Sequence, residues 1–478
     1  MLRQFGLSLL IVLLIMKVIG VIARGPSPLV LDAREYWDLG GLVATGDVWL
    51  IGEAIAYRTP GYPWLIGVMR AWFPQPLLGL VCLQGALWLG SVGLTALIAR
   101  DLSGRRQSVG LVLGVSLAML SSLTYTAAVL SETLFTFLLM AHLWSMCRFV
   151  RRPALTGGVW VGLTLGLTIL TRPIGLLIWV ADAIFLVGRW HCFPAASTDS
   201  FCRRRGWVGA GVAGVVALAC LTPWLVRNER LFGRVMLTEF VGRNVWIVTF
   251  QDGSGAGLNW PRSSSSEQLE NQLTESVWND MVSDGSWRHT WTVSRALTAS
   301  GLDDASADRL MKRVAKDAIS DAPVTFVKKS LRRWINFWRT RATDLPPQFA
   351  ELSQQDIAAI AVTRGKEPFA GQDVWGIKVA PIDTALRFRW SNWLSGNTLL
   401  VFVMVAAVML LLWHRDTRSA GLWLAALLGY VSGITAALEI PDYRYRMIVE
   451  PVVVVAVVSA VAPLLFSPEP NAASSTDA

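Results

Sequence analysis

Residues 32–64 read DAREYWDLGGLVATGDVWLIGEAIAYRTPGYPW and separate two long apolar runs, residues 6–23 and 76–99. The stretch mixes acidic, basic and aromatic residues and ends in the rigid sequence RTPGYP at residues 58–63. Connections between membrane spans seldom carry so many ionisable side chains, and polar residues held beside a membrane usually mark a site. We therefore expect this segment to form a functional site, with the apolar segments arranged around it.

The composition indicates a polytopic membrane protein. The 478 residues are 53% hydrophobic and 16% charged, whereas about a quarter of an ordinary soluble chain is charged. The mean hydropathy is +0.46. The 23 tryptophans agree with this class, because indole rings favour the two membrane–water interfaces. In such a protein the net charge of +9 belongs to loops beside the membrane, so no nucleic-acid partner is expected.

About ten apolar runs are long enough, or nearly so, to cross roughly 30 Å of hydrocarbon. They are residues 6–23, 76–99, 108–124, 128–147, 157–170, 174–187, 207–226, 398–413, 422–438 and 447–465. The first run lacks a small-residue cleavage site, so we expect a retained helix and not a signal peptide. Thr171-Arg172-Pro173 breaks one apolar region, because proline ends or kinks a helix. The sequence thus predicts an all-α bundle of about ten transmembrane helices.

The loop arginines orient this bundle. If every run crosses, five groups share one side: Arg3; Arg100, Arg105 and Arg106; Arg148, Arg151 and Arg152; Arg189 and Arg203 to Arg205; Arg415 and Arg418. By the positive-inside rule that side is the cytoplasm. We expect a multi-pass protein of the cytoplasmic (inner) membrane with both termini inside. The segments 24–75, 125–132, the Arg172 turn, 227–397 and 439–446 then face outward.

Four parts are expected along the chain. Residues 1–226 form a transmembrane module with the first outer loop at 24–75, residues 227–397 a mixed extracytoplasmic region, residues 398–466 the C-terminal transmembrane helices, and residues 467–478 a disordered tail. Within 322–341, apolar residues recur at helical spacing and Lys and Arg fill the other face. This pattern predicts an interfacial amphipathic helix that either anchors the region to anionic lipid or guides a lipid phosphate.

No cofactor is indicated by the cysteines. The five are Cys82, Cys147, Cys192, Cys202 and Cys220. Their spacing matches neither a metal site nor a disulfide framework, so we expect reduced, structural thiols and no metal.

Ionisable residues gather at the predicted outer ends of the helices. Asp32 and Tyr36 are four residues apart, which places both on one helix face, and Glu132 begins an apolar helix on the same side. A carboxylate at such a position acts as a general base or binds a cation, unless it only caps its helix. The arginines at outer helix ends are Arg58, Arg172, Arg227, Arg444 and Arg446. Guanidinium groups suit a phosphate through bidentate hydrogen bonds, although each could also snorkel to the interface.

These motifs, in this order, resemble the type C glycosyltransferases. The segments are DAREY at 32–36, RTPGYP at 58–63, SETLF at 131–135, LTRP at 170–173, PWLVRN at 223–228 with FG at 232–233, and DYRYR at 442–446. The chain is most similar to the group of dolichyl-phosphate-mannose protein mannosyltransferases and aminoarabinose transferases. The match runs from the first predicted helix to the last.

The resemblance implies a polyprenyl-phosphate sugar donor, an inverting reaction without a metal, and an active site facing away from the cytoplasm. By position, Asp32 corresponds to the essential acid of the first outer loop and Glu132 to that of the second, while Arg444 and Tyr445 would hold the lipid phosphate. The expected substrate-binding residues are Tyr36, Arg58, Tyr62, Arg172, Arg227, Arg444, Tyr445 and Arg446. The expected acceptor is a lipid, a glycan or a protein. The first outer acid lacks the Asp-Glu pair typical of protein mannosyltransferases, which argues against a protein acceptor.

Two alternatives from other classes remain. A secondary transporter would place ionisable residues near the bilayer midplane and often shows inverted repeats. A polyprenyl-lipid-dependent ligase or polymerase of surface polysaccharide would share the arginines without needing an acid directly after the first helix.

Overall fold

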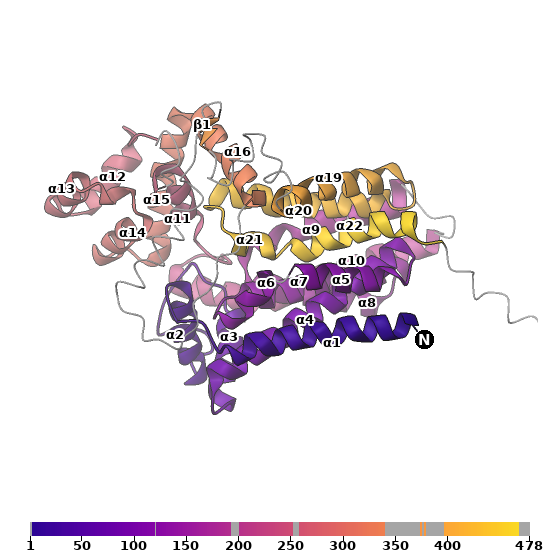
Figure 1. The fold of residues 1–478 in the computed structure, drawn as a ribbon. Helices are drawn as coiled ribbons and strands as arrows, with labels where there is room; N and C mark the ends of the chain where they lie inside the picture. Colours follow the sequence, from indigo (N-terminus) through magenta and orange to yellow (C-terminus); the bar gives the residue numbers. More distant parts are fainter. Residues whose placement is uncertain are drawn as a thin grey trace, which may run out of the picture.

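The computed structural model describes residues 2–119, 121–192, 200–251, 258–339, 373–374, 377–378 and 396–467. The described residues are mostly helical, which confirms the expected fold class. They also include two short antiparallel strands, β1 (Asp373–Val374) and β2 (Ile377–Lys378). Long helices lie side by side in a bundle, and shorter helices stack against one end of it (Figure 1).

The apolar runs expected from the sequence are helical, and they form the bundle. The helices are α1 (Leu2–Ala23), α4 (Pro76–Ser103), the bent pair α5 (Ser108–Ala118) and α6 (Ser121–Thr124), α7 (Glu132–Arg151), α8 (Leu155–Thr171), α9 (Ile178–Val187), α10 (Ser200–Phe232), α19 (Gly396–Trp413), α20 (Arg418–Leu438) and α22 (Glu450–Leu465). Of the described helices, 6 are long and apolar enough to span a membrane, or 7 if the bent pair counts as one span. The chain is therefore multi-pass, and the total of about ten crossings stays a prediction.

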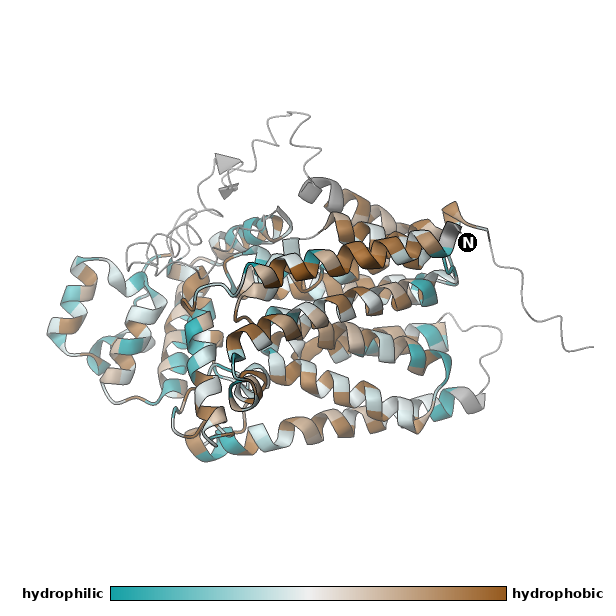
Figure 2. Cartoon of the chain, turned by 60° about the horizontal axis from the view of Figure 1, so that its bottom comes forward, coloured by the Kyte–Doolittle hydropathy of each residue, from teal (hydrophilic) through white to brown (hydrophobic). Residues whose placement is uncertain are grey.

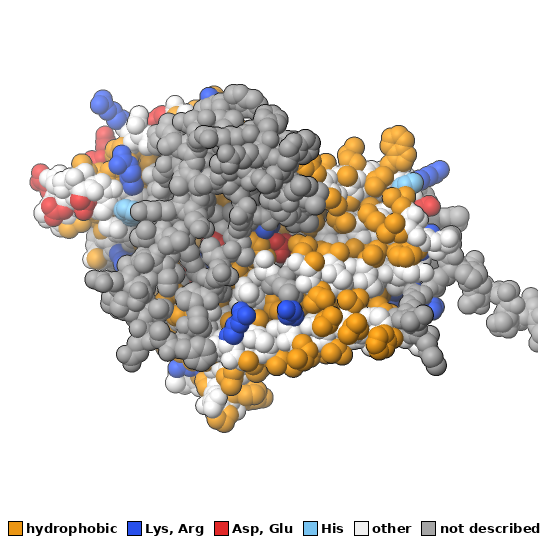
Figure 3. All heavy atoms as spheres, in the orientation of Figure 1, with side chains coloured by type: hydrophobic (Ala, Val, Ile, Leu, Met, Phe, Trp, Pro, Cys, Tyr) orange, Lys and Arg blue, Asp and Glu red, His pale blue; other side chains and the backbone are white. Residues whose placement is uncertain are grey.

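The outer surface of the bundle is apolar. On α1, Phe5 is 70% exposed and Met16 is 59% exposed, as expected for a helix whose neighbour is lipid. Apolar residues dominate the long helices in Figure 2. On the face seen in Figure 3, hydrophobic side chains cover the bundle, while charged side chains gather at its two ends.

Glycines bring α8 and α10 into close contact. Gly158, Gly162 and Gly166 recur every four residues on α8. A Cβ atom at Gly158 would lie 2.2 Å from the carbonyl oxygen of Gly209, and one at Gly162 would lie 2.3 Å from that of Ala213. Small residues at this spacing let two membrane helices pack backbone against backbone. This contact fixes the end of α8, where Arg172 follows.

The first and the last helix of the bundle begin and end, respectively, on the same side. In Figure 1 the start of α1 and the end of α22 are at the same end of the bundle, away from the short helices. There the Arg105 guanidinium donates to the carbonyl oxygen of Phe466 at 2.9 Å, joining the loop after α4 to the end of α22. This arrangement is the one that alternate crossing of the expected spans requires.

Short helices cover the other end. The bundle's own short elements there are α2 (Asp32–Ala44), α3 (Gly61–Trp72), η1 (Tyr125–Ala127), η2 (Pro173–Leu177) and α21 (Tyr443–Met447). A second group, the α11–α15 unit, comprises α11 (Val241–Trp246), η4 (Ile247–Gln251), α12 (Ser264–Gln272), α13 (Glu275–Ser283), η5 (Ser286–Arg288), α14 (Thr290–Ala299) and α15 (Asp304–Asp321). This unit has its own aromatic core, in which Trp246, Trp260 and Trp287 contact Phe250.

The basic helix α16 (Pro323–Arg339) is oriented differently from the sequence expectation. Its apolar residues Val324 and Val327 are 66% and 63% exposed, whereas Lys329 and Arg333 are buried. Arg333 donates to the carbonyl oxygen of Ala436 at 2.6 Å, near the end of α20, where helix carbonyls lack partners. Lys329 and Arg333 therefore bond to the protein interior, and the choice between anchoring to lipid and guiding a lipid phosphate stays open for the helix as a whole. The interfacial position of the helix stays a prediction, and residues 340–341 lie outside the described residues.

Candidate functional site

A cavity of about 1340 Å³ lies between the end of the bundle and the α11–α15 unit. Its lining comes from α2, the loop before α3, the start of α7, the break after α8, the side of α14 and the corner between α20 and α21. Seven of the residues expected at the site line it: Asp32, Tyr36, Arg58, Glu132, Arg172, Arg444 and Tyr445. Segments more than 400 positions apart in sequence thus meet here, as in the contact of Asp32 with Arg444.

Asp32 lies between two arginines. Its Oδ1 atom accepts from Arg58 Nη2 at 2.8 Å, and its Oδ2 atom accepts from Arg444 Nη1 at 2.6 Å. Leu31, directly before it, has φ 51° and ψ −125°, a conformation that non-glycine residues rarely adopt. Such backbone outliers persist where the surrounding structure enforces them, often at functional sites.

The two arginines decide the ionisation of Asp32. Burial by itself would favour the neutral acid, but Arg444 and Arg58 outweigh it and hold the pKa of Asp32 well below its usual range. Asp32 is therefore a carboxylate throughout the neutral pH range. Because both oxygens are bonded to cations, it is also a weak base in this arrangement.

Arg58 connects Asp32 to a second acid that the sequence reasoning missed. Its Nη2 atom donates to Glu35 Oε2 at 2.6 Å, and its Nη1 atom donates to the Tyr36 hydroxyl at 3.3 Å. The guanidinium also lies 4.6 Å from the centroid of the Tyr36 ring, within cation–π distance. Asp32 and Glu35 are three residues apart on α2 and so lie on one helix face, which lets Arg58 bond both carboxylates; this spacing is the sequence signal that could have identified Glu35.

A parallel pair forms deeper in the cavity. Arg172 Nη1 lies 2.7 Å from Glu132 Oε1, and Arg444 Nε lies 3.9 Å from the same oxygen. Pro173 cannot continue α8, so Arg172 takes an extended conformation (φ −150°, ψ 134°) at the end of the helix. Among the described residues, Glu132 Oε2 has no hydrogen-bond donor although Glu132 is only 2% exposed. A buried carboxylate oxygen without a donor is costly and is commonly explained by a bound ligand or water.

Tyr445 and Glu439 continue the chain of hydrogen bonds that leads from Arg444. Arg444 Nη2 donates to the Tyr445 hydroxyl at 3.0 Å, and that hydroxyl donates to Glu439 Oε2 at 3.3 Å. Burial raises the pKa of Glu439 to about 7, although Arg444 and Arg172 oppose the shift. Sequence reasoning placed Glu439 at an outer corner without giving it a role. Burial decides its behaviour, and the sequence gives no signal of that burial.

Three residues expected to bind substrate do not line the cavity. Arg227 donates to the carbonyl oxygens of Trp49 at 2.9 Å, Leu50 at 2.5 Å and Ile55 at 3.2 Å. It is 5% exposed and holds the loop before α3 in place. We therefore correct its expected role to a structural one.

The other two are equally enclosed. Arg446 is 3% exposed, its Nη1 atom donates to the carbonyl oxygen of Trp338 at 2.8 Å, and its Nε atom lies 3.3 Å from Glu450 Oε1. Tyr62 is fully buried; its hydroxyl donates to Gln84 Oε1 at 2.9 Å, and its ring contacts the Tyr36 ring edge to face at 5.1 Å. Tyr62 supports Tyr36 from behind and does not contact the cavity.

Asp32, Glu35 and Glu132 are paired with arginines, and the described acids of the cavity are not grouped as metal ligands. In the described part of the chain, no group of three or more His, Cys, Asp or Glu side chains is placed to hold a metal ion. Cys82, Cys147, Cys192 and Cys220 are free thiols. Independence from a metal stays a prediction.

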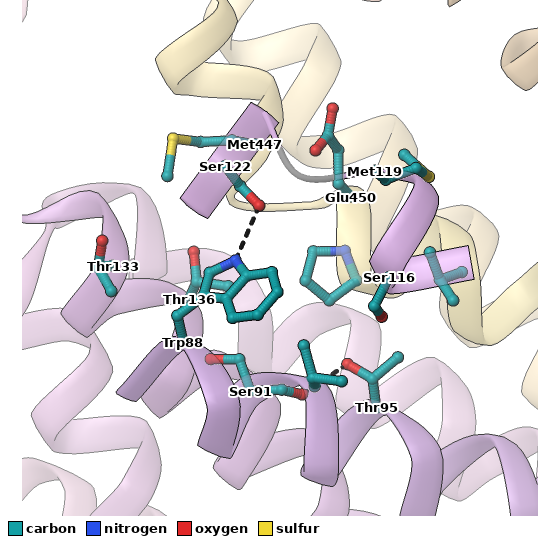
Figure 4. A pocket seen from close by; sticks show the side chains of 13 residues that line it. Trp88, Ser91, Thr95, Ser116, Met119, Ser122, Thr133, Thr136, Met447 and Glu450 are labelled. Atoms are coloured by element: carbon teal, nitrogen blue, oxygen red, sulfur yellow. Dashed lines mark hydrogen bonds between the residues drawn. The ribbon is translucent and has the colours of Figure 1, made fainter. Parts of the chain in front are cut away.

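A second cavity is too small for this chemistry. It encloses about 50 Å³ between α4, α5, α7 and α22, and hydroxyl groups and Glu450 line it (Figure 4). The Trp88 indole donates to the Ser122 hydroxyl at 3.0 Å across it (Figure 4). A space of this size holds at most a few water molecules, so the larger cavity is the candidate site.

The comparisons with known proteins concern the fold alone. No protein-family profile and no curated protein sequence matches the chain. Among solved structures, it is similar to the archaeal oligosaccharyltransferase AglB from Archaeoglobus fulgidus, in complex with an inhibitory peptide and a dolichol-phosphate. The TM-score is 0.51 at 12% identity, over 97% of this chain and 50% of that chain.

A second similar structure is ArnT from Cupriavidus metallidurans in the apo state, with a TM-score of 0.36 at 15% identity, over 95% of this chain and 78% of that chain. Both proteins are type C glycosyltransferases. The fold assignment rests on AglB, and the chain spans about half of the AglB chain's length. The protein therefore has the fold of AglB, a type C glycosyltransferase, which confirms the fold that the sequence resemblance predicted.

Proposed function

We propose that this protein is an integral-membrane glycosyltransferase. It moves a sugar from a polyprenyl-phosphate donor to an acceptor on the extracytoplasmic side of the cytoplasmic membrane, with inversion at the sugar carbon. The observation that carries this proposal is the alternation of Arg58, Arg172 and Arg444 with Asp32 and Glu132 along one wall of a large cavity at the end of the bundle.

The arginines suit the leaving phosphate. Arg444 and Arg172 converge on Glu132 Oε1, so a phosphate beside them would meet two guanidinium groups. Positioned cations stabilise charge that develops on a leaving group. The same part of the cavity has an apolar lining, formed by Ile174, Leu176, Leu177, Ile434 and Leu438, which suits an isoprenoid chain. The dolichol-phosphate bound to AglB supports a lipid phosphate as donor.

Donor binding would also activate Asp32. A phosphate that takes hydrogen bonds from Arg58 and Arg444 competes with Asp32 for the same N–H groups. Once these bonds weaken, the pKa of Asp32 rises and the carboxylate becomes a better base. Asp32 then accepts the proton of the acceptor hydroxyl, whose oxygen attacks the sugar carbon as the bond from that carbon to the phosphate oxygen breaks. If the acceptor is itself an ionised phosphate, Asp32 orients it instead.

Glu132 has the geometry of a positioning group. Its Oε1 atom is held by Arg172 at 2.7 Å, and its Oε2 atom has no donor among the described residues. A sugar hydroxyl would satisfy this oxygen once a neighbouring side chain moves, since Oε2 is closed to solvent in this arrangement. The pair thus binds phosphate through Arg172 and the adjacent sugar through Glu132.

The location of the cavity favours an enzyme over the transporter alternative. The ionisable residues that line it lie at the ends of α7, α8 and α20, whereas transporters bind their substrate near the midplane. The ligase or polymerase alternative shares the arginines and differs in its need for Asp32.

A direct test uses the purified full-length protein in detergent or nanodiscs. A panel of radiolabelled polyprenyl-phosphate sugars is incubated with cell-envelope lipids, glycans and proteins. We expect wild-type protein to transfer label from at least one donor and to release polyprenyl phosphate in equal amount. If folded protein neither turns over nor binds any donor, the proposal fails and transport of a solute in proteoliposomes becomes the next assay.

The pKa of Glu439 predicts how donor use depends on pH. Below pH 7 Glu439 is mostly neutral, and above it the carboxylate competes with the donor phosphate for Arg444 and Arg172. We expect kcat/KM for the donor to fall as pH rises through about 7. In Glu439→Gln, kcat/KM for the donor should stay at its low-pH value as the pH rises through this range. An unchanged pH profile in that variant would assign the fall to another group.

The same shift has a consequence for stability. The pKa of Glu439 in the folded protein, about 7, lies above the ordinary value of 4.5. The folded state therefore binds this proton more tightly than the unfolded state, and stability falls as pH rises from 4.5 towards 7. Thermal unfolding of wild type and Glu439→Gln over this range measures the difference.

A further inference from the structure

Three aromatic rings that contact one another line the large cavity. Tyr57, Phe240 and Trp291 all line the cavity. Their ring centroids are 5.4 Å apart for Tyr57 and Phe240, 5.4 Å for Tyr57 and Trp291, and 6.2 Å for Phe240 and Trp291. They come from the loop before α3, the residue before α11 and the first turn of α14. We refer to these three residues as the aromatic wall.

Helix α14 adds polar groups beside the wall. Trp291, Ser294, Arg295 and Thr298 line the cavity, and their spacing of three and four residues places them on one helix face. This face offers an indole, two hydroxyls and a guanidinium side by side. The wall therefore combines flat aromatic surface with hydrogen-bonding groups at its edge.

A buried ion cluster holds the wall in place. The Arg243 guanidinium lies 5.2 Å from the centroid of the Tyr57 ring and 5.7 Å from that of Trp291, and it pairs with Asp304 and Asp308. Asp304 Oδ2 also accepts from the backbone N–H of Ala56 at 2.7 Å. Arg243 is 1% exposed and Asp308 is fully buried. These contacts order the rings before a ligand arrives, which lowers the entropic cost of binding.

The wall adjoins the candidate base. The Arg58 guanidinium lies 5.4 Å from the centroid of the Tyr57 ring and 2.8 Å from Asp32 Oδ1. Arg58 is thus the side chain that lies between a ligand on the aromatic wall and Asp32. The apolar and arginine-rich part suited to the lipid phosphate lies on the bundle side, so the wall occupies the acceptor side of the cavity.

The chemistry of the wall fits a sugar ring. A pyranose has a face of C–H groups and a rim of hydroxyls; its C–H groups interact with the electron-rich faces of aromatic rings, and its hydroxyls need partners of the kind α14 supplies. An extended peptide is commonly bound by pairing with a strand edge. The described residues that line the cavity are helical or loop, and none belongs to a strand.

We propose that the aromatic wall and the cavity-facing side of α14 form the acceptor subsite, which binds a sugar ring, so that the acceptor is a glycan. This inference rests on the proposed function. It names the acceptor class, which neither the fold nor the arginine and acid pairs specify. The glycan is either a free oligosaccharide or a lipid-linked one, since the ring presents the same faces in both.

The test compares wild-type protein with Trp291→Ala, both as full-length chains in nanodiscs. Binding is screened on an array of oligosaccharides, and bound glycans are examined by saturation-transfer NMR, in which protons of a stacked ring face receive the strongest transfer. Loss of one stacking partner is expected to weaken binding about fivefold. With donor turnover established, KM for the glycan should rise by the same factor while KM for the donor is unchanged. A lipid-linked form of the bound glycan is assayed in parallel to distinguish the two sources.

Two variants control for folding. Trp291→Phe keeps an aromatic ring and should bind glycans nearly as wild type does. Trp72→Ala removes a tryptophan that is 79% exposed on α3 and does not line the cavity, and it should leave glycan binding unchanged. Donor hydrolysis without any acceptor reports the proposed function separately. The subsite inference is overturned if the array binds no wild-type protein, if Trp291→Ala binds as wild type does, or if peptides are glycosylated in place of glycans.

Discussion

Replacement of Asp32 by Asn is expected to lower kcat for sugar transfer about a thousandfold, the upper part of the range for loss of a positioned general base. Asn has nearly the same shape and still accepts one hydrogen bond, and Arg58 keeps its bond to Glu35 Oε2 at 2.6 Å. The fold and donor binding should therefore survive. The measurements are single-turnover transfer from the donor that wild-type protein uses, and the dissociation constant of that donor.

An exposed acid provides the matched control for this variant. Asp280 is exposed on α13 and does not line the cavity, so Asp280→Asn should transfer sugar at the wild-type rate. If Asp32→Asn keeps full activity, Asp32 is not the general base. That result would favour the polyprenyl-lipid ligase or polymerase, which does not require an acid after the first helix.

Replacement of Arg444 by Ala is expected to lower kcat about a hundredfold, because a positioned charge that stabilises the leaving phosphate is lost. Arg444 also bonds Asp32 Oδ2 at 2.6 Å and the Tyr445 hydroxyl at 3.0 Å, so its loss alters the base as well. Arg444→Lys keeps the charge but not the fork of N–H groups and should recover activity only in part. Rates of donor cleavage measure the effect.

Inhibition by free polyprenyl phosphate separates the two roles of Arg444. If the guanidinium binds the phosphate, Arg444→Ala should raise the inhibition constant together with its effect on kcat. Arg230 is exposed near the end of α10 and does not line the cavity, so Arg230→Ala should change neither value. If the inhibition constant is unchanged in Arg444→Ala, Arg444 does not bind the phosphate, and its effect on kcat comes from its contact with Asp32.

Similar arginines at helix ends took different roles, which shows the limit of sequence reasoning. Arg227 and Arg172 each directly follow an apolar run. Arg227 meets the carbonyl oxygens of Trp49 and Leu50, while Arg172 meets Glu132 across the cavity. A guanidinium fits a carbonyl group or an anion equally well. Its partner is therefore chosen by which distant segment packs nearby.

The sequence by itself determined the membrane class, the helical bundle and the helix ends where the ionisable residues gather. These follow from hydropathy and charge along the chain, because lipid requires each span to satisfy its own backbone hydrogen bonds. It also identified Asp32, Glu132, Arg58, Arg172 and Arg444, because ionisable residues directly beside apolar runs can be recognised without knowing how the helices pack.

Only the tertiary structure decided which of these side chains share a cavity. It assigned Glu35 and Glu439 to the site, enclosed Arg446, and brought Tyr57, Phe240 and Trp291 together from three separate segments. Such outcomes depend on contacts between residues far apart in the chain and on burial, which sets both hydrogen-bond partners and pKa values. Neither quantity is a property of a local sequence, so periodicity and motif spacing could not supply them.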